Sequence, residues 1–432
     1  MKMGLAIIGS QFGDEGKGKI VDFLAGKADV VVRFNGGNNA GHTVKIGMKE
    51  YKLHLLPSGL FHPKKRNLIA SNVVINPKIL IGEIESLRKS GIPVSPKNLG
   101  IDYRSHLIMP WHILLEGGSN SQKIGTTGRG IGPCYEDKAA RTGIRFEDLL
   151  DQNELANKIR LQYENKVRVM QTTSIIYPPD FNFASIYSEY LAYGKVLGSF
   201  ACDVSSELHS LNSKNKSILF EGAQGTFLDN NFGTYPFLTS SNTTAPAAAV
   251  SCGVPNSFIT QPEGVVKAYT TRVGNGILPT EISGELAEKI RSKGKEFGTT
   301  TGRARRIGWL DLPMLRTACK LNGFTGLHLT KLDVLAGLDE IKIATHYRLG
   351  KKLLPDFPAN SHDLHKCVPA YRSFKGFKDE DWKAVAKKGK KMGLKALPSN
   401  AQTYVNFIQK ELNVPLSSVS VGPEREEIIF LK

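Results

Sequence analysis

The residues best suited to chemistry lie in one glycine-rich stretch near the N-terminus. An apolar run, Leu5–Ile8, stops at Gly9, and further glycines at positions 13, 16 and 18 alternate with charged residues. Glycine lets backbone N–H groups approach an anion closely, and a helix beginning behind such a loop favours negative charge. Apolar residues resume at helical spacing from Ile20. The order strand, loop, helix therefore predicts a phosphate-binding loop.

This loop departs from the standard Walker A motif at two positions. Gln11 stands where the first glycine is expected, and Gly18 replaces the hydroxyl residue after Lys17. Asp14 could supply the missing oxygen ligand for Mg²⁺. The alternative is a plain turn between strand and helix, and the spacing of charged residues favours phosphate binding over it.

A second loop follows the apolar run Val30–Phe34 and is rich in asparagine and glycine. It ends in Gly41-His42-Thr43. Such a composition is hard to explain by packing and is typical of binding loops. An imidazole ionises near neutral pH, so His42 is suited to donate a proton to a phosphate or a leaving group. A capped loop histidine is the alternative.

Two later loops, residues 124–133 and 297–306, combine threonine, glycine and arginine. Hydroxyl, guanidinium and backbone N–H donors together fit phosphate or carboxylate. We expect the second loop to act as a mobile clamp. A basic surface loop would explain its arginines but not its three consecutive threonines.

Three more polar segments follow strand-like runs. Gln224 comes after Ile218–Phe220, at the strand end where ligands gather in open α/β sheets. Lys331-Leu332-Asp333 resembles the tripeptide with which GTPases grip guanine, and Ser420–Arg425 forms another loop. So many anion-type loops indicate two phosphorylated ligands and a small acid.

The elements that must position these loops are short apolar runs that alternate with helical patterns. The patterns cover residues 77–89, 146–169 and 184–211. This alternation predicts an α/β fold with a large, mostly parallel sheet flanked by helices. We expect a single domain, residues 1–432, with a helical insertion at about 148–215 and a polar elaboration at about 341–397.

The composition limits the possible classes of function. The 432 residues include 57 Lys and Arg against 40 Asp and Glu, a net charge of +17. That charge could attract nucleic acid, but no aromatic residues interleave the cluster Lys383–Lys395. We therefore expect polyanionic small substrates, no nucleic acid, and a solvated face for that cluster.

The chain shows no feature of a membrane or exported protein. No run of 18 apolar residues occurs, and the first strand follows Met1 too closely for a signal peptide. Five scattered cysteines form no CxxC pair, so we expect neither a zinc site nor a disulfide framework. These observations predict a cytoplasmic protein without membrane partners.

Together the motifs resemble the adenylosuccinate synthetase family over essentially the whole chain. The segments that carry the resemblance are Gln11–Lys19, Asn35–Thr43, Gly125–Lys138, Glu221–Thr226, Gly233–Thr244, Thr299–Arg306, Thr330–Asp333 and Val421–Arg425. The resemblance implies a fold related to the P-loop GTPases, a homodimer, and ligation of IMP and L-aspartate with GTP and Mg²⁺. Another GTP-dependent P-loop ligase or kinase with a different acceptor is the alternative.

The resemblance also implies four catalytic residues. Asp14 would take the N1 proton of IMP and bind Mg²⁺ together with the backbone carbonyl of Gly41. His42 would be the acid facing the GTP phosphates. Lys17 would stabilise the phosphoryl group in transfer, and Gln224 would act on IMP.

The binding residues that the resemblance implies form three sets. At IMP it places Asp14, Glu15, Gly16, Lys17, Asn39, Ala40, Gly41, His42, Thr127, Arg141, Gln224, Thr239 and Arg303, with Arg141 reaching the site of the partner subunit. At GTP it places Gly13, Asp14, Glu15, Gly16, Lys17, Gly18, Lys19, Gly41, His42, Thr43, Arg305, Lys331, Leu332, Asp333, Ser420, Val421 and Gly422. At aspartate it places Thr299, Thr300, Thr301, Gly302, Arg303, Ala304 and Arg305.

Three positions depart from the family pattern. Phe12 stands where the family usually has tryptophan, and Ala304 replaces one residue of a basic run. We expect fewer anion contacts at Ala304. The segment Ala245–Ala248 contains less glycine than the family's loop, so its conformation is open at this point.

Overall fold

The centre of the protein is a ten-stranded sheet, seen in a computed structural model that describes residues 4–46, 49–117, 125–298 and 302–431. From one edge to the other the order is β21 (Ile428–Phe430), β20 (Leu416–Ser420), β16 (Gly326–Thr330), β11 (Gln261–Lys267), β1 (Gly4–Gly9), β10 (Ile218–Glu221), β2 (Val30–Arg33), β5 (Arg66–Ile69), β7 (Leu99–Asp102) and β9 (Ala201–Cys202). Every neighbouring pair is parallel except β20 and β21. The predicted α/β fold with a mostly parallel sheet is confirmed.

Strand β1 lies in the middle of the sheet because both of its faces are apolar. Ala6 and Ile8 belong to one hydrophobic cluster, whereas Ile7 belongs to another that includes Ile20 and Val21 of helix α1 (Lys17–Ala25). Successive strand residues point to opposite faces, so a continuous apolar run is what a doubly covered strand requires. The packing of α1 against this strand fixes the loop between them.

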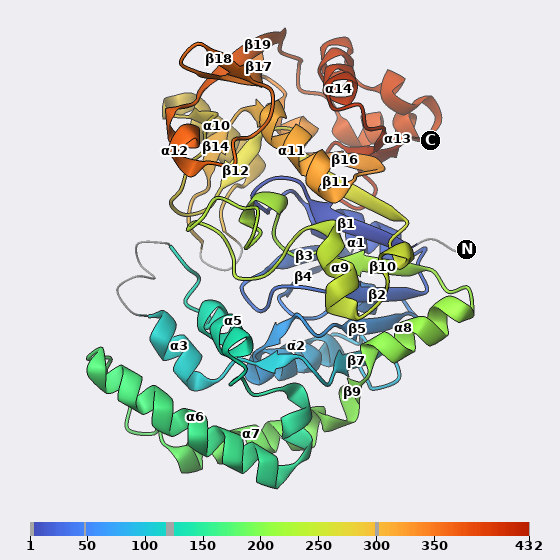
Figure 1. The fold of residues 1–432 in the computed structure, drawn as a ribbon. Helices are drawn as coiled ribbons and strands as arrows, with labels where there is room; N and C mark the ends of the chain where they lie inside the picture. Colours follow the sequence, from blue (N-terminus) through green and yellow to red (C-terminus); the bar gives the residue numbers. More distant parts are fainter. Residues whose placement is uncertain (1–3, 47–48, 118–124, 299–301, 432) are drawn as a thin grey trace.

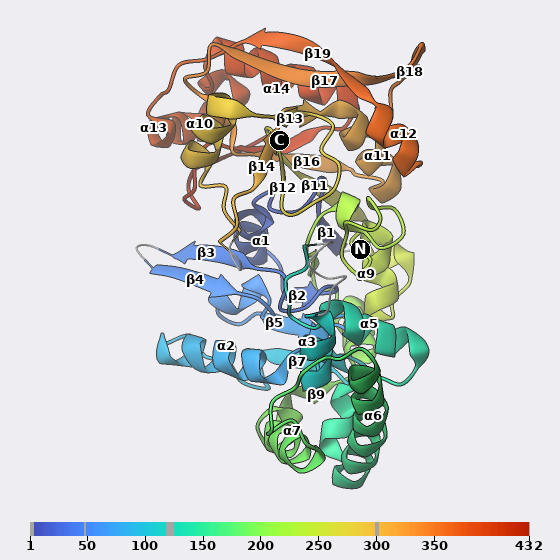
Figure 2. The same ribbon diagram turned by 90° about the vertical axis from the view of Figure 1, so that its left-hand side faces the viewer.

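Two of the α-helices within residues 148–215 lie at one end of the molecule (Figures 1 and 2), and the third lies beside the central sheet. Helices α6 (Gln152–Thr172) and α7 (Phe183–Leu197) share a hydrophobic cluster with α2 (Pro77–Lys89). The helix predicted over residues 77–89 is confirmed.

The single helix predicted over residues 184–211 is wrong. Helix α7 ends at Leu197, a 3-10 turn follows at Gly198–Phe200, and β9 then joins the edge of the central sheet. A new helix, α8 (Val204–Ser213), begins after Asp203, whose carboxylate accepts the Ser206 N–H at 3.2 Å. The region forms two helices and not one, because Asp203 caps the N-terminus of the second helix.

The opposite end of the molecule contains residues 341–397, which were expected to form a polar elaboration. They contribute to an antiparallel unit of β17 (Glu340–Leu349), β18 (Lys352–Leu354) and β19 (Val368–Lys375) and to helices α12 (Ser361–Lys366) and α13 (Trp382–Met392). Helix α13 buries Val385, Ala386 and Gly389 and exposes its lysines to solvent. Within the described residues, no helix is long and apolar enough to cross a membrane.

Candidate active site

The glycine loop between β1 and α1 is shaped from within by Glu15. This residue is fully buried, and its Oε1 accepts the N–H groups of Gln11 at 3.0 Å and Gly13 at 2.9 Å. Its Oε2 accepts from Lys17 Nζ at 2.7 Å. The carboxylate of Glu15 therefore stabilises the loop from within and is engaged by protein groups at both of its oxygens.

Asp14 and Gln224 share an unusual backbone conformation on two facing loops. Both have φ of 59°, in the left-handed region that residues other than glycine seldom adopt. Such strain concentrates at functional sites. The loops interlock through glycines, since a Cβ on Gly225 would lie 2.4 Å from the nitrogen of Gly13. The fold thus holds Asp14 and Gln224 in a fixed relation.

A row of side-chain amides extends from Gln224. Asn35 Nδ2 donates to Gln224 Oε1 at 3.3 Å, and Gln224 Nε2 donates to Asn39 Oδ1 at 3.3 Å. Asn39 Nδ2 in turn donates to Thr239 Oγ1 at 3.4 Å. Three residues predicted at the nucleotide from separate segments of the chain are therefore joined by hydrogen bonds.

These loops surround a cavity of about 680 Å³, which is within the range of small-molecule sites. The predicted residues that line it are Gly13, Asp14, Gly16, Lys17, Gly18, Lys19, Asn39, Ala40, Gly41, Thr127, Gln224, Thr239, Arg303, Arg305 and Lys331. The cavity lies at the carboxyl ends of β1 and β10, as predicted for an open parallel sheet.

Other predicted residues do not line this cavity. They are Glu15, Arg141, Gly302, Ala304, Leu332, Asp333, Ser420, Val421 and Gly422. His42 and Thr43 are described through their backbone alone, at the start of β3 (His42–Ile46). Thr299, Thr300 and Thr301 lie outside the described residues.

Lys19 connects the glycine loop to the C-terminal loop. Its Nζ donates to Ser420 Oγ at 3.0 Å and to the carbonyl oxygens of Gly422 at 2.7 Å and Glu427 at 3.1 Å. Burial lowers the pKa of Lys19 to about 8. Burial also raises the pKa of Asp333, against the attraction of Lys19 and Lys331. The Lys19 ammonium is thus committed to holding this loop next to α1.

Sequence reasoning missed several residues of the cavity wall. Arg33, Glu116, Glu221, Phe237 and Asn275 all line it. Asn275 stood between two glycines, the same signal that marked the other loops, and could have been found that way. Glu221 and Phe237 lie in the segments Glu221–Thr226 and Gly233–Thr244, which were singled out but gave these two residues no role. Arg33 and Glu116 had no local signal, because their position depends on the packing of distant segments.

Two departures from the family pattern have a clear structural setting. The guanidinium carbon of Arg272 lies over the Phe12 ring, 4.3 Å from the ring centre. Arg272 also donates to the Phe237 carbonyl at 2.7 Å. Ala245 begins helix α9 (Ala245–Cys252), and its N–H donates to Asn322 Oδ1 at 2.8 Å. The segment Ala245–Ala248 is therefore helical.

The comparisons with known proteins agree over the whole chain. A model described as adenylosuccinate synthetase matches residues 6–429. The adenylosuccinate synthetase of Clostridium perfringens is 45% identical over 99% of this chain and 98% of its own length, and that of Carboxydothermus hydrogenoformans is 47% identical with the same coverage.

A solved structure leads to the same family. A fully ligated adenylosuccinate synthetase from Plasmodium falciparum has a TM-score of 0.91 and 36% identity, covering 99% of this chain and 100% of its own. A succinoaminodeoxyadenylate synthetase of cyanophage S-2L is 18% identical with a TM-score of 0.63, which shows a shared fold alone. The chain belongs to the adenylosuccinate synthetase family and is a GTP-dependent ligase of IMP and L-aspartate.

Proposed function

We propose that the ligation takes place in the cavity between the glycine loop and Gln224, with Asp14 as the catalytic base. The observation that carries this proposal is that Asp14 and Gln224, both in the left-handed backbone conformation, lie on interlocked loops. Both residues line one cavity, which Lys17 also lines. A carboxylate in this position can take the N1 proton of a purine whose ring rests against the amide row.

The first chemical step makes the oxygen on C6 of IMP a nucleophile. Loss of the N1 proton to Asp14 places negative charge on that oxygen, which attacks the γ-phosphate of GTP and releases GDP. Charge develops on the phosphoryl group during transfer, and Lys17 and His42 would neutralise it. The product is 6-phosphoryl-IMP.

In the second step the amine of L-aspartate attacks C6 and phosphate leaves. The amine loses a proton, and the new carbon–nitrogen bond gives adenylosuccinate. Arg303 and Arg305 line the cavity, and guanidinium groups bind carboxylates in a bidentate manner. We assign Arg303, Arg305, Thr299–Thr301, Gly302 and Ala304 to aspartate.

IMP would occupy the cavity, and GTP would extend from the glycine loop beyond the residues that line the cavity. We assign IMP to Asn39, Ala40, Thr127, Gln224 and Thr239, which lie along and beside the amide row. We assign the phosphates of GTP to the loop Gly13–Lys19 with Gly41, His42 and Thr43. The guanosine end would lie by Arg305, Lys331–Asp333 and Ser420–Gly422.

The residues present fit a Mg²⁺ ion. Asp14 and the backbone of Gly41 both line the cavity and offer the oxygen ligands that this ion prefers. Among the described residues, no three His, Cys, Asp or Glu side chains gather as an all-protein metal site. Mg²⁺ bound through few protein ligands and substrate phosphates needs no such cluster. When bound, the ion would neutralise phosphate charge.

We also propose a homodimer in which Arg141 serves the IMP phosphate of the partner subunit. Arg141 is exposed at the end of helix α5 (Ile131–Ala140) and does not line the cavity of its own chain. An arginine held outward in the left-handed conformation, φ 64°, is suited to reach another chain. A cytoplasmic location fits the five free thiols.

The decisive test is turnover with IMP, GTP, Mg²⁺ and L-aspartate, followed through the ultraviolet shift of the purine. We expect adenylosuccinate only when all three substrates are present. GTP hydrolysis without this shift would instead support a ligase or kinase with a different acceptor. Binding of RNA or DNA should stay weak at near-physiological salt, because the net charge is unmatched by a stacking surface.

A further inference from the structure

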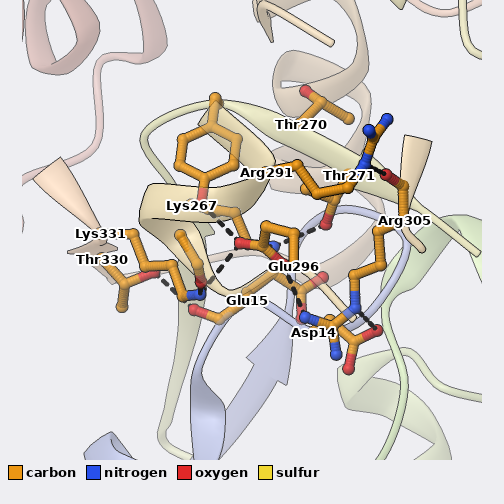
Figure 3. A network of polar contacts seen from close by, with 12 residues as sticks. Asp14, Glu15, Lys267, Thr270, Thr271, Arg291, Glu296, Arg305, Thr330 and Lys331 are labelled. Carbon is orange, nitrogen blue, oxygen red and sulfur yellow. Dashed lines mark hydrogen bonds and ion pairs between the residues drawn. The ribbon is translucent and has the colours of Figure 1, made fainter. Parts of the chain in front are cut away.

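Beside the cavity, one buried carboxylate is surrounded by cations. Glu296 has no exposed surface, and its Oε1 lies 3.0 Å from Lys267 Nζ and 2.9 Å from Lys331 Nζ (Figure 3). Its Oε2 accepts from Arg305 Nη1 at 2.6 Å, and the hydroxyl of Tyr269 donates to Oε1. Three of these groups contact Oε1 and one contacts Oε2, so the buried carboxylate is engaged by protein groups at both of its oxygens.

The groups around Glu296 come from separate parts of the chain. Lys267 ends β11, Glu296 follows helix α10 (Gly284–Gly294), and Arg305 precedes β14 (Arg306–Gly308). Lys331 comes directly after β16. Of these, Arg305 and Lys331 line the cavity, whereas Glu296 and Lys267 lie behind it. The Glu296 carboxylate therefore contacts two cavity-lining residues, Arg305 and Lys331, from behind the cavity.

The Glu296 carboxylate orients both Arg305 and Lys331. The ammonium of Lys331, a cavity-lining residue, donates to the Gly294 carbonyl at 2.6 Å as well as to Glu296. Arg305 uses Nη1 for Glu296 and brings Nε to 2.9 Å from Asp14 Oδ2. The guanidinium of Arg305 therefore connects Glu296 to Asp14.

The charge balance explains why a carboxylate is needed. Lys267, Lys331 and Arg305 place three positive charges around Glu296, and Lys267 is buried enough for its pKa to fall to about 8. These attractions hold the pKa of Glu296 below its ordinary value. Without the central charge the three cations would repel one another, and a buried cation without a partner is costly.

We propose that Glu296 is a positioning residue for GTP, which sets Arg305 and Lys331 as one rigid wall and couples the base end of the nucleotide site to Asp14. The inference deepens the proposed function, since it rests on the assignment of Arg305 and Lys331 to GTP. It predicts that loss of the Glu296 charge weakens the binding of GTP more than the binding of IMP.

The test uses Glu296→Gln, which keeps the shape and removes the charge. We expect the KM for GTP to rise about tenfold or more, as for loss of a buried hydrogen bond to a charged group, while the KM for IMP changes less than about twofold. Calorimetric binding of GDP should weaken by a similar factor. GDP affinity equal to that of the unaltered protein overturns the inference.

Three further variants separate positioning from folding. Glu296→Asp keeps the charge and should recover part of the GDP affinity. Asp311→Asn changes another buried carboxylate outside the cavity and should leave the KM for GTP unchanged. If Glu296→Gln does not fold, the pair Lys267→Met with Glu296→Gln removes one charge of each sign, and unchanged GDP affinity in that pair overturns the inference.

The proposed function is tested separately by turnover of the unaltered protein. No adenylosuccinate from that protein would refute the function itself. Normal turnover with normal GDP binding by the folded Glu296 variants would refute the inference alone.

Discussion

Arg305 Nε lies 2.9 Å from Oδ2 of Asp14, so the proposed base forms an ion pair with a residue of the proposed aspartate loop. The contact, drawn in Figure 3, joins two residues that are far apart in sequence and that both line the cavity. It connects the group that would remove a proton from one substrate to the loop that would bind another. Any change at Asp14 must therefore be judged against its effect on Arg305.

The first prediction is that Asp14→Asn lowers kcat far more than it weakens IMP binding. Asparagine tolerates the left-handed backbone at this position, and Arg305 keeps Glu296 as a buried partner. The change therefore removes the base without leaving an unpaired cation. We expect kcat to fall about 10²–10⁴-fold, as for loss of general base catalysis. Steady-state kinetics with calorimetric IMP binding would check it, and a change confined to KM would contradict it.

The glycine loops could be predicted from sequence because their geometry restricts the residue type. Gly13 and Gly16 have φ of 81° and 86°, which glycine adopts without strain. Helix α2 was predicted to the residue from the spacing of its apolar residues, and its start at Pro77 is stabilised by Asn76, which accepts the Ile79 N–H at 3.2 Å. Local chemistry marked these features, so a single sequence was enough.

Other features depend on contacts that no local pattern records. The helical period of residues 184–211 continues across Gly198, which itself has helical angles, and the cap at Asp203 marks the start of a separate helix. Glu296 follows Lys295 in an ordinary charged segment. Its burial requires Lys267 and Lys331 from distant strands, so its role could not be predicted from its neighbours.

The second prediction concerns the interlocked loops. In Gly225→Ala the new Cβ would lie 2.4 Å from Gly13 N and 2.5 Å from the Gln11 carbonyl oxygen. Backbone atoms cannot yield as a flexible side chain does, so we expect a loss of about 1–3 kcal/mol of stability from overpacking. The kcat/KM for IMP should also fall, because Gln224 must move. Denaturant unfolding and steady-state kinetics would measure both effects.

The matched control for that variant is Gly82→Ala, in the exposed face of helix α2. Apart from its chain neighbours and the backbone of its own helix, no described heavy atom lies within 4 Å of the new Cβ, and alanine favours a helix over glycine. We expect a gain of about 0.5–1 kcal/mol with unchanged kinetics. Equal behaviour of the two variants would show that the loops are not closely packed.

The third prediction is a pH dependence of stability from Asp311. This residue is 1% exposed, accepts the Met314 N–H at 3.1 Å and bonds the Tyr347 hydroxyl. Burial raises its pKa from 3.8 to about 6. The folded state therefore holds the proton more tightly than the unfolded state, and the stability from this group is full below about pH 4 and lost as the pH rises through about 6.

The size of this pH effect on stability follows from the rise in the pKa of Asp311. A rise of about two pKa units corresponds to roughly 3 kcal/mol. Urea unfolding of the protein and of Asp311→Asn from pH 4 to pH 8 would measure it as a difference. We expect the advantage of the unaltered protein over the variant to shrink by roughly that amount across the range. A difference independent of pH would show that Asp311 titrates normally.

The last prediction tests the shared site by mixing two inactive chains. Arg141→Leu leaves Asp14 intact, and Asp14→Asn leaves Arg141 intact, so a mixed dimer contains one site with both groups. Arg141 is exposed and absent from the cavity of its own chain, so the change should not disturb folding. Random mixing makes half of the dimers mixed, each with one competent site, and recovery of about a quarter of the normal activity is expected. Confirmed mixed dimers without any recovered activity would show that Arg141 does not act across the interface.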